Sequence, residues 1–464
     1  MKKVLAAAAV ACALAAVSSA GAATRLGEHD GGHRNALPLP ATPLGWGVAD
    51  DASKYADDGG AWVYSELAGA NLTENRWTVA WDAADPSSIK ELPFLQRAAP
   101  VAQAAGVHVV LALYSGVGGT SQPDARNHDP AAFCAWAQLV AKTVQKWGIR
   151  DFIIGNEPSS TKYWVPQKDA SGNDVAAPAY EALLAACYDS LHALDGGGWV
   201  ANVIGMGLSA KAAGKTSNQP LAFLRDVGAA YRSSGRATPI MDQLALHPYP
   251  LPAGTPSPDK GYANLPDAYG PPDLGRVKQA VFDAFDGTGQ PTTLNGLTFR
   301  LDEFGWQTIE SGAPYTGVET AGPPGSAPAV SEETQIAYLQ QAAAMFACDP
   351  TVTDVELFLL VDEQQLSGWQ SGLLTAGGKG VSRAKPAYGA LGPVFGAGRG
   401  ACTAGAVAWM PALTATAGAS RLVGTALVSP RAKAIARCRA RSAGVKNPKR
   451  RLACIAAARR RYKH

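Results

Sequence analysis

A (β/α)8 barrel of the α/β class is the fold that this 464-residue chain predicts, on three observations. Eight short apolar runs alternate with helical patterns between residues 44 and 361. The connecting segments before the apolar runs are short, whereas the connecting segments after them are long. No Gly-x-Gly-x-x-Gly motif follows the first run, which counts against the structural rival, a doubly wound sheet.

The strands are expected at 44–48, 76–81, 107–114, 151–155, 200–205, 241–246, 297–301 and 355–361. Most of these runs are almost continuously apolar, as is typical of parallel strands that are buried on both faces. Helices are expected at 94–105, 130–147, 178–194, 221–234, 273–285 and 331–346. In the second of these helices, Asp129 is the expected N-cap, Pro130 takes the first position and Gly148 follows the end.

The lengths of the loops indicate where a functional site would lie. Residues 148–150 form a short link into a strand, whereas the Pro- and Gly-rich segments 250–272 and 307–330 follow strands. In a barrel, all loops that follow strands lie at one face, and barrel enzymes place their active sites there. Loops of this length and composition therefore favour a binding or catalytic role.

Two glutamates come directly after buried strand residues. Glu157 follows the fourth strand and Glu303 follows the seventh, so both are expected at the mouth of the barrel. A carboxylate at the end of a buried strand costs free energy, so such a residue is expected to have an ionic or hydrogen-bonding partner or a functional role. Paired carboxylates are what glycoside hydrolysis requires, one protonated to assist the leaving oxygen and one ionised to attack the anomeric carbon.

The sequence Asn156-Glu157-Pro158, together with Glu303, resembles the retaining glycoside hydrolases of clan A, with families 5 and 39 the nearest. The resemblance covers roughly residues 40–395. Enzymes of this clan are (β/α)8 barrels. The resemblance implies that Glu157 is the general acid and base, that Glu303 is the nucleophile, and that Asn156 contacts the sugar 2-hydroxyl.

Other positions extend the resemblance. His247-Pro248-Tyr249 closes the sixth strand like the His-x-Tyr element of the clan, and Arg76 opens the second strand. The resemblance implies that Tyr249 and Arg76 keep Glu303 ionised and oriented, and that His247 lines the subsite of the sugar that is cleaved. Arg76 is the weakest match, because it begins its strand instead of ending it.

Aromatic and acidic residues complete the expected site. Trp369, just after the eighth strand, resembles the tryptophan platform of the clan, and Trp306 or Trp46 is expected to stack on sugar in the same way. Asp302 is expected to make a structural hydrogen bond. No metal-binding or cofactor-binding motif is found in the sequence, so no cofactor is expected.

The ends of the chain differ from its middle. Residues 1–23 resemble a secretory signal peptide, with two lysines, an apolar stretch at 4–17 and small residues before the cleavage site. Residues 24–40 would be a flexible leader, 41–397 the catalytic barrel and 398–464 a basic tail. We therefore expect a secreted, monomeric protein without a transmembrane segment after signal cleavage.

Charge is distributed unevenly along the chain. All 38 acidic residues lie at or before Glu363, and the net charge of residues 1–363 is −15. Residues 431–463 contain 13 Lys and Arg. The tail would bind an anionic cell-wall polymer or lipid, or the acidic barrel, or remain a solvated appendage. Nucleic-acid binding is not expected, because Tyr462 is the only aromatic residue among these charges.

Six cysteines remain once Cys12 leaves with the signal peptide. An even number in an exported protein favours disulfides, although six cysteines allow 15 connectivities. The expected pairs are Cys438 with Cys454 in the tail, and Cys134 with Cys187 on two successive helices.

The function expected from all these features is that of a secreted retaining β-glycoside hydrolase that acts on a polysaccharide or oligosaccharide. Two alternatives remain open. The chain could be a non-catalytic carbohydrate-binding or cell-surface protein built on an inactive barrel. Alternatively, the basic tail could be the active part, with the barrel as its scaffold.

Overall fold

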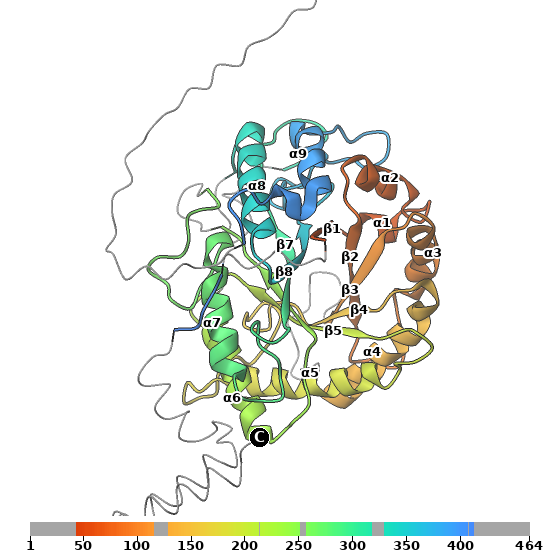
Figure 1. Ribbon diagram of the computed structural model, residues 1–464. Helices are drawn as coiled ribbons and strands as arrows, with labels where there is room; N and C mark the ends of the chain where they lie inside the picture. Colours follow the sequence, from red (N-terminus) through yellow and green to blue (C-terminus); the bar gives the residue numbers. More distant parts are fainter. Residues whose placement is uncertain are drawn as a thin grey trace, which may run out of the picture. The chain divides into compact units, whose positions relative to one another are not determined.

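The computed structural model describes residues 43–115, 129–212, 214–250, 257–317, 329–406 and 408–412 (Figure 1). Eight parallel strands form a closed barrel in sequence order, which confirms the predicted fold. The strands are β1 (Gly45–Ala49), β2 (Glu74–Trp81), β3 (His108–Ser115), β4 (Asp151–Ile154), β5 (Asn202–Ser209), β6 (Gln243–His247), β7 (Thr298–Phe304) and β8 (Val352–Leu357).

Helices surround the barrel (Figure 1). They are α1 (Ala52–Tyr55), α2 (Ala61–Gly69), α3 (Leu92–Ala104), α4 (Pro130–Val144), η2 (Gln145–Trp147), α5 (Ala176–His192), α6 (Pro220–Ser234), η3 (Pro271–Asp273), α7 (Leu274–Phe285), α8 (Glu332–Ala347), α9 (Pro386–Ala397) and η4 (Gly398–Ala401). The six expected helices are present within a few residues of their predicted ends. The helices α1, α2 and α9 were not expected from the sequence.

The strand β8 differs most from its prediction, because it lies three to four residues earlier than the apolar run 355–361. The amides of Leu360 and Val361 donate to one oxygen of the Asp50 carboxylate, both at 3.0 Å. These two residues therefore pair with a side chain of the neighbouring loop and leave the sheet, although they are as apolar as a strand.

Alternate residues of each strand face the helices and the barrel interior, since the side chains of a strand point to opposite faces in turn. In β3, Leu111 and Leu113 belong to the large core between strands and helices. A separate buried apolar cluster fills the middle of the barrel, and it consists of Val110, Ala112, Ile153, Ile204 and Ala245. Charged side chains occupy the interior on both sides of this apolar layer.

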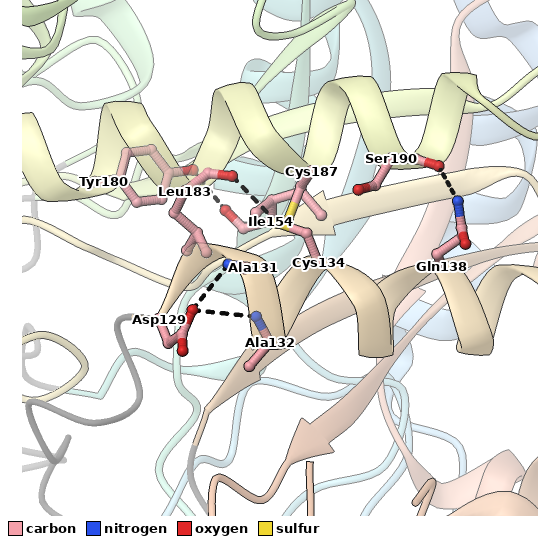
Figure 2. The surroundings of a disulfide bond; sticks show 10 residues. All are labelled: Asp129, Ala131, Ala132, Cys134, Gln138, Ile154, Tyr180, Leu183, Cys187 and Ser190. Carbon is pink, nitrogen blue, oxygen red and sulfur yellow. Dashed lines mark hydrogen bonds between the residues drawn. A yellow bond between two sulfur atoms is a disulfide. The ribbon is translucent and has the colours of Figure 1, made fainter. Parts of the chain in front are cut away.

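The disulfide between Cys134 and Cys187 joins α4 to α5 and confirms one expected pair (Figure 2). Asp129 caps α4 by accepting hydrogen bonds from the amides of Ala131 and Ala132, as predicted. On α5, the Tyr180 hydroxyl donates to the carbonyl of Ile154 at 2.5 Å. These contacts fix α5 against the end of β4, immediately before the segment that contains Glu157.

A second disulfide, which the sequence analysis did not anticipate, joins Cys348 at the end of α8 to Cys402. It holds the chain to the barrel beyond residue 397, where the basic tail was expected to begin. The expected pair Cys438–Cys454 and the expected signal peptide lie outside the described residues, as does most of the tail. No helix in the part of the chain that the structure describes is long and apolar enough to cross a membrane.

Candidate active site

A cavity of about 1040 Å³ opens at the face where the strands end, and the loops that follow the strands line it. Glu157 and Glu303 both line this cavity, although 146 positions separate them in the sequence. The other predicted residues in its wall are Arg76, Asn156, Tyr249, Trp306 and Trp369. The barrel thus brings most of the predicted site together in one place.

The backbone after β4 turns sharply to present Glu157. Gly155 and Glu157 both have positive φ, at +89° and +43°. The Glu157 amide donates to the Gly207 carbonyl of β5 at 2.9 Å, which holds this conformation. A non-glycine residue in this region costs about 1–3 kcal/mol, and such strain is concentrated at functional sites. The fold therefore maintains an unfavourable backbone in order to direct the Glu157 side chain into the cavity.

Glu303 is held by three neighbouring side chains. Arg76 Nη1 donates to its Oε1 at 3.1 Å, and the Tyr249 hydroxyl donates to its Oε2 at 3.1 Å. His247 Nδ1 lies 3.6 Å from the same Oε2. The Glu303 side chain is 13% exposed, so its carboxylate is oriented by fixed donors and still reaches the cavity. Burial and the nearby carboxylates, Glu303 first, raise the pKa of Tyr249 well above 10, which keeps its proton available for this hydrogen bond.

His247 is fully buried beneath the two glutamates. Its Nδ1 lies 3.0 Å from Glu157 Oε1, and its Nε2 lies 3.3 Å from Asp302 Oδ2. Burial alone would lower the pKa of His247, but Glu303, Asp302 and Glu157 raise it to about 10. Both ring nitrogens face acceptors, so the imidazole carries two protons and a positive charge at neutral pH.

One oxygen of Glu157, one nitrogen of His247 and one oxygen of Glu303 all lie within 4.8 Å of one another. Such a trio has the residue types of a metal site, but a histidine binds a metal only through an unprotonated nitrogen. The raised pKa of His247 instead favours an ion-pair arrangement, in which the imidazolium ion balances the charge of the carboxylates.

Arg76 joins several parts of the site, although it lies near the beginning of its strand. Its Nη2 donates to Asn156 Oδ1 at 2.8 Å, and its Nε lies 3.2 Å from Asp302 Oδ2. The strand β2 begins two residues earlier than predicted, at Glu74. Because Arg76 pairs with Ala49, the last residue of β1, it lies level with the carboxyl end of that neighbouring strand.

Asp302 is completely buried between Arg76 and His247. Burial opposes its ionisation, but these two cations, His247 first, hold the pKa of Asp302 below its usual range. Its contacts are ion pairs with these two cations, whereas the sequence led us to expect a structural hydrogen bond. Asp302 acts on the cavity indirectly, through the two cations that contact Glu303.

The three tryptophans that were predicted to contact sugar have different surroundings. Trp369 is half-buried in the cavity wall, with its ring 5.2 Å from that of Tyr249 and 5.3 Å from that of Phe358. Trp306 also lines the cavity but is only 2% exposed and packs edge-on against Phe304. Trp46 is not brought to the cavity, because it is buried in the core with its ring 4.7 Å from Phe395 of α9.

Two further residues of the cavity wall were not found by sequence reasoning. Tyr163 lies on the loop after β4, and burial together with Glu157 and Glu303 raises its pKa well above 10. Asp50 follows β1, and burial raises its pKa to about 6. The only sequence signal for either residue is its position in a segment after a strand.

No family model matches the chain, and no curated protein matches its sequence. Among solved structures, a family 39 glycoside hydrolase from Bacteroides cellulosilyticus WH2 aligns with 76% of this chain and 64% of its own length, at 16% identity and a TM-score of 0.52. This chain therefore spans less than two thirds of that protein. A β-glucosidase from Thermotoga maritima, in complex with galacto-hydroximolactam, aligns with 77% of this chain and 98% of its own length, at 10% identity and a TM-score of 0.50. The likeness in fold to clan A barrels, which the motif around Glu157 predicted, is thereby confirmed.

Proposed function

We propose that the protein is a secreted retaining β-glycoside hydrolase that cleaves a polysaccharide or oligosaccharide. The observation that carries the proposal is the short distance between the two glutamates in one cavity, where an oxygen of each lies within 4.8 Å of the other. Retaining enzymes hold their carboxyl groups about 5–5.5 Å apart, whereas inverting enzymes leave about 6.5–9.5 Å for a water molecule. The spacing therefore favours double displacement.

In the first step, Glu303 attacks the anomeric carbon and forms a covalent glycosyl-enzyme ester, while Glu157 gives its proton to the leaving oxygen. In the second step, Glu157 takes a proton from water, and the water attacks the anomeric carbon and releases Glu303. Arg76 and Tyr249 orient the attacking carboxylate through the two hydrogen bonds described above. The positive charges of Arg76 and His247 also stabilise the carboxylate that departs when the ester breaks.

The sugar would lie between polar and aromatic walls. Asn156 lines the cavity, and its Oδ1 accepts a hydrogen bond from Arg76 at 2.8 Å, so its amide NH2 would be the group that donates to a sugar 2-hydroxyl. Trp369 offers its ring to an apolar sugar face. Trp306 is too buried to stack on sugar with a whole face, so its proposed role is to support the wall.

Export is supported by the two disulfides, because such bonds persist in oxidising compartments. The basic segment 431–463 would then attach the enzyme to an anionic cell-wall polymer. Its deletion should release the protein from cell walls without changing the hydrolysis of small substrates.

The decisive experiment measures the release of nitrophenol from a panel of 4-nitrophenyl β-glycosides by the wild type and by Glu157→Ala and Glu303→Ala. We expect Glu303→Ala to be inactive, and to yield an α-glycosyl azide when azide takes the place of the carboxylate. Glu157→Ala should instead yield the β-azide, because azide then attacks the glycosyl-enzyme. Glu333→Ala, which removes an exposed carboxylate in the first turn of α8, serves as the matched control.

Unchanged hydrolysis in both variants would refute the proposal. The rival function, a carbohydrate-binding protein on an inactive barrel, predicts that the wild type binds sugars but releases no nitrophenol from any glycoside of the panel.

A further inference from the structure

The two sides of the cavity differ in charge. Lys162 and Lys211 line it on the side of β4 and β5, whereas Asp51 and Glu363 line it on the side of β1 and β8. Because the barrel is closed in sequence order, β4 and β5 lie across its mouth from β8 and β1 (Figure 1). The cavity is therefore basic at one end and acidic at the other.

Among the described residues, the ammonium groups of the two lysines form no hydrogen bond with another side chain or with the backbone. Lys162 is exposed, and its ammonium lies 4.8 Å from the centre of the Tyr163 ring. Tyr163 is the tyrosine whose pKa is raised by burial and by Glu157 and Glu303. Lys211 is half-buried, two residues beyond the end of β5. Within the described residues, neither lysine forms an ion pair. Both lie in residues 1–363, a part of the chain whose net charge is −15.

Hydrogen bonds join the two loops that carry these lysines. The hydroxyls of Ser159 and Ser209 lie 3.1 Å apart, and the Asn218 amide donates to the Ser159 carbonyl at 2.9 Å. The Thr161 amide also donates to Ser217 Oγ at 3.0 Å. These bonds fix the loop after β4 against the loop after β5. The backbones of Lys162 and Lys211 are thus held at the same rim.

The opposite end carries negative charge beside the tryptophan. One carboxylate oxygen of Glu363 accepts the Trp369 amide at 2.7 Å, and the residue is exposed without an ion pair among the described residues. The Asp51 side chain is 29% exposed and lies 3.3 Å from Lys54. An anionic sugar bound over Trp369 would therefore meet like charge, which is unfavourable.

The direction of the substrate follows from the role of the acid. Glu157 must contact the oxygen that leaves, so the departing group extends from Glu157 along its own loop, toward Lys162 and Lys211. We infer that the substrate is an acidic saccharide with a neutral sugar over Trp369 and an anionic group, a carboxylate or a sulfate, on the departing part. This inference rests on the proposed function and specifies its substrate class.

The test uses three aryl β-glycosides of the sugar that the nitrophenyl panel identifies, with 3-carboxyphenyl, 3-sulfophenyl and 3-carbamoylphenyl as leaving groups. The carbamoyl compound matches the carboxylate in size but is neutral. In the Lys162→Gln/Lys211→Gln double variant, the ratio of kcat/KM for the carboxylate to that for the amide should fall about tenfold, as expected for the loss of two partly exposed ion pairs. The wild-type ratio should also fall in 0.5 M NaCl, because salt screens such pairs.

Lys142→Gln, on the outer helix α4 and away from the cavity, is the matched control and should leave both rates unchanged. The sulfonate compound distinguishes a general preference for anions from one restricted to carboxylates. Equal rates for the charged and neutral compounds, with no change in their ratio in the double variant, would overturn the inference and leave the proposed function intact. Failure to hydrolyse any compound of the initial panel would refute both.

Discussion

The barrel interior has an upper half, toward the carboxyl ends of the strands and the cavity, and a lower half, toward their amino ends. Both halves contain similar charged residues, but the two sets have different roles. In the upper half, Arg76 contacts Glu303 at 3.1 Å and Asp302 at 3.2 Å. In the lower half, Arg300, which is 2% exposed, contacts Glu74 at 2.7 Å and also pairs with Asp354 and Glu356. Each half thus has one buried arginine among several carboxylates.

Each half also contains a histidine between carboxylates. His247 lies among Glu157, Asp302 and Glu303, whereas His108 lies 2.7 Å from Asp151 and 3.4 Å from Glu74. The strands β2 and β7 contribute to both halves, through Glu74 and Arg76 and through Arg300 and Asp302. The same alternation of inward-facing residues therefore supplies both networks.

The networks differ in which carboxylates reach the large cavity where the strands end. In the lower half, Glu356 is completely buried and Glu74 and Asp354 are 7% and 16% exposed, and all three pair with Arg300, so this network connects the strands. In the upper half, the side chains of Glu157 and Glu303 are 20% and 13% exposed to the cavity. A buried cluster of charges becomes a candidate catalytic site when two of its carboxylates can reach a substrate.

The largest expected effect is on stability, from Arg300→Met. Removing this cation leaves three carboxyl groups without their shared partner, which should lower the free energy of unfolding by about 3–5 kcal/mol. The kcat/KM of the remaining folded protein should stay close to the wild-type value. Urea denaturation measures the first quantity and an aryl glycoside assay the second. Arg225→Met is the control, because the ion pairs of Arg225 are partly exposed and such pairs contribute at most about 1 kcal/mol.

The matched change in the upper half, Arg76→Met, should act mainly on catalysis. Loss of a preorganised donor to Glu303 should lower kcat/KM by about 10²–10³-fold. Stability should fall less than in Arg300→Met, because water in the cavity can solvate Glu303 and the buried Asp302 keeps His247 as a partner. A variant that unfolds as easily as Arg300→Met yet keeps its activity would remove the distinction between the two halves.

The histidines predict how stability depends on pH. Burial alone would lower the pKa of each histidine, but neighbouring carboxylates raise the pKa of both His247 and His108 to about 10, from the usual 6.5. Because the folded state binds these protons more tightly than the unfolded state, the stabilisation is complete below pH 6.5 and is lost progressively toward pH 10. The free energy of unfolding of the wild type should therefore decrease across this range.

Variants separate the contributions of the two histidines. His108→Gln should flatten the dependence of stability on pH and leave the pH profile of kcat/KM as it is in the wild type. His247→Gln should change both quantities, since His247 contacts the catalytic glutamates. An alkaline limb of kcat/KM that moves only in His108→Gln would contradict this assignment.

The smallest expected effect concerns two glutamates that share Arg300. Burial raises the pKa of Glu356 well above its usual value, so a neutral glutamine should replace this side chain at little cost. Burial would also raise the pKa of Glu74, but Arg300 and His108 hold it below the usual range, so Glu74 is ionised. We expect Glu356→Gln to change the free energy of unfolding by less than about 1 kcal/mol and Glu74→Gln to lower it by about 1.5–3 kcal/mol. Denaturation at neutral pH measures the free energy of unfolding of both variants. Equal losses of stability in the two variants would show that Glu74 and Glu356 share the negative charge.

The amino-acid sequence was enough to predict the barrel and to place two glutamates at its mouth. Continuous apolar runs between helical patterns indicate parallel buried strands, and the polar residues that follow such runs are expected at the rim. This reasoning placed Glu157 and Glu303 on the same face before their distance was known. Tyr249 was placed there by the resemblance of His247-Pro248-Tyr249 to the His-x-Tyr element of the clan.

Which side chains contact one another depends on the three-dimensional packing of the strands. The stagger between β1 and β2 places Arg76 among Asn156, Asp302 and Glu303, although its position near the start of β2 suggested otherwise. The same packing buries Trp46 in the core. The physical reason is that periodicity reports the face of a strand on which a residue lies, whereas contacts across a barrel depend on the register of all eight strands.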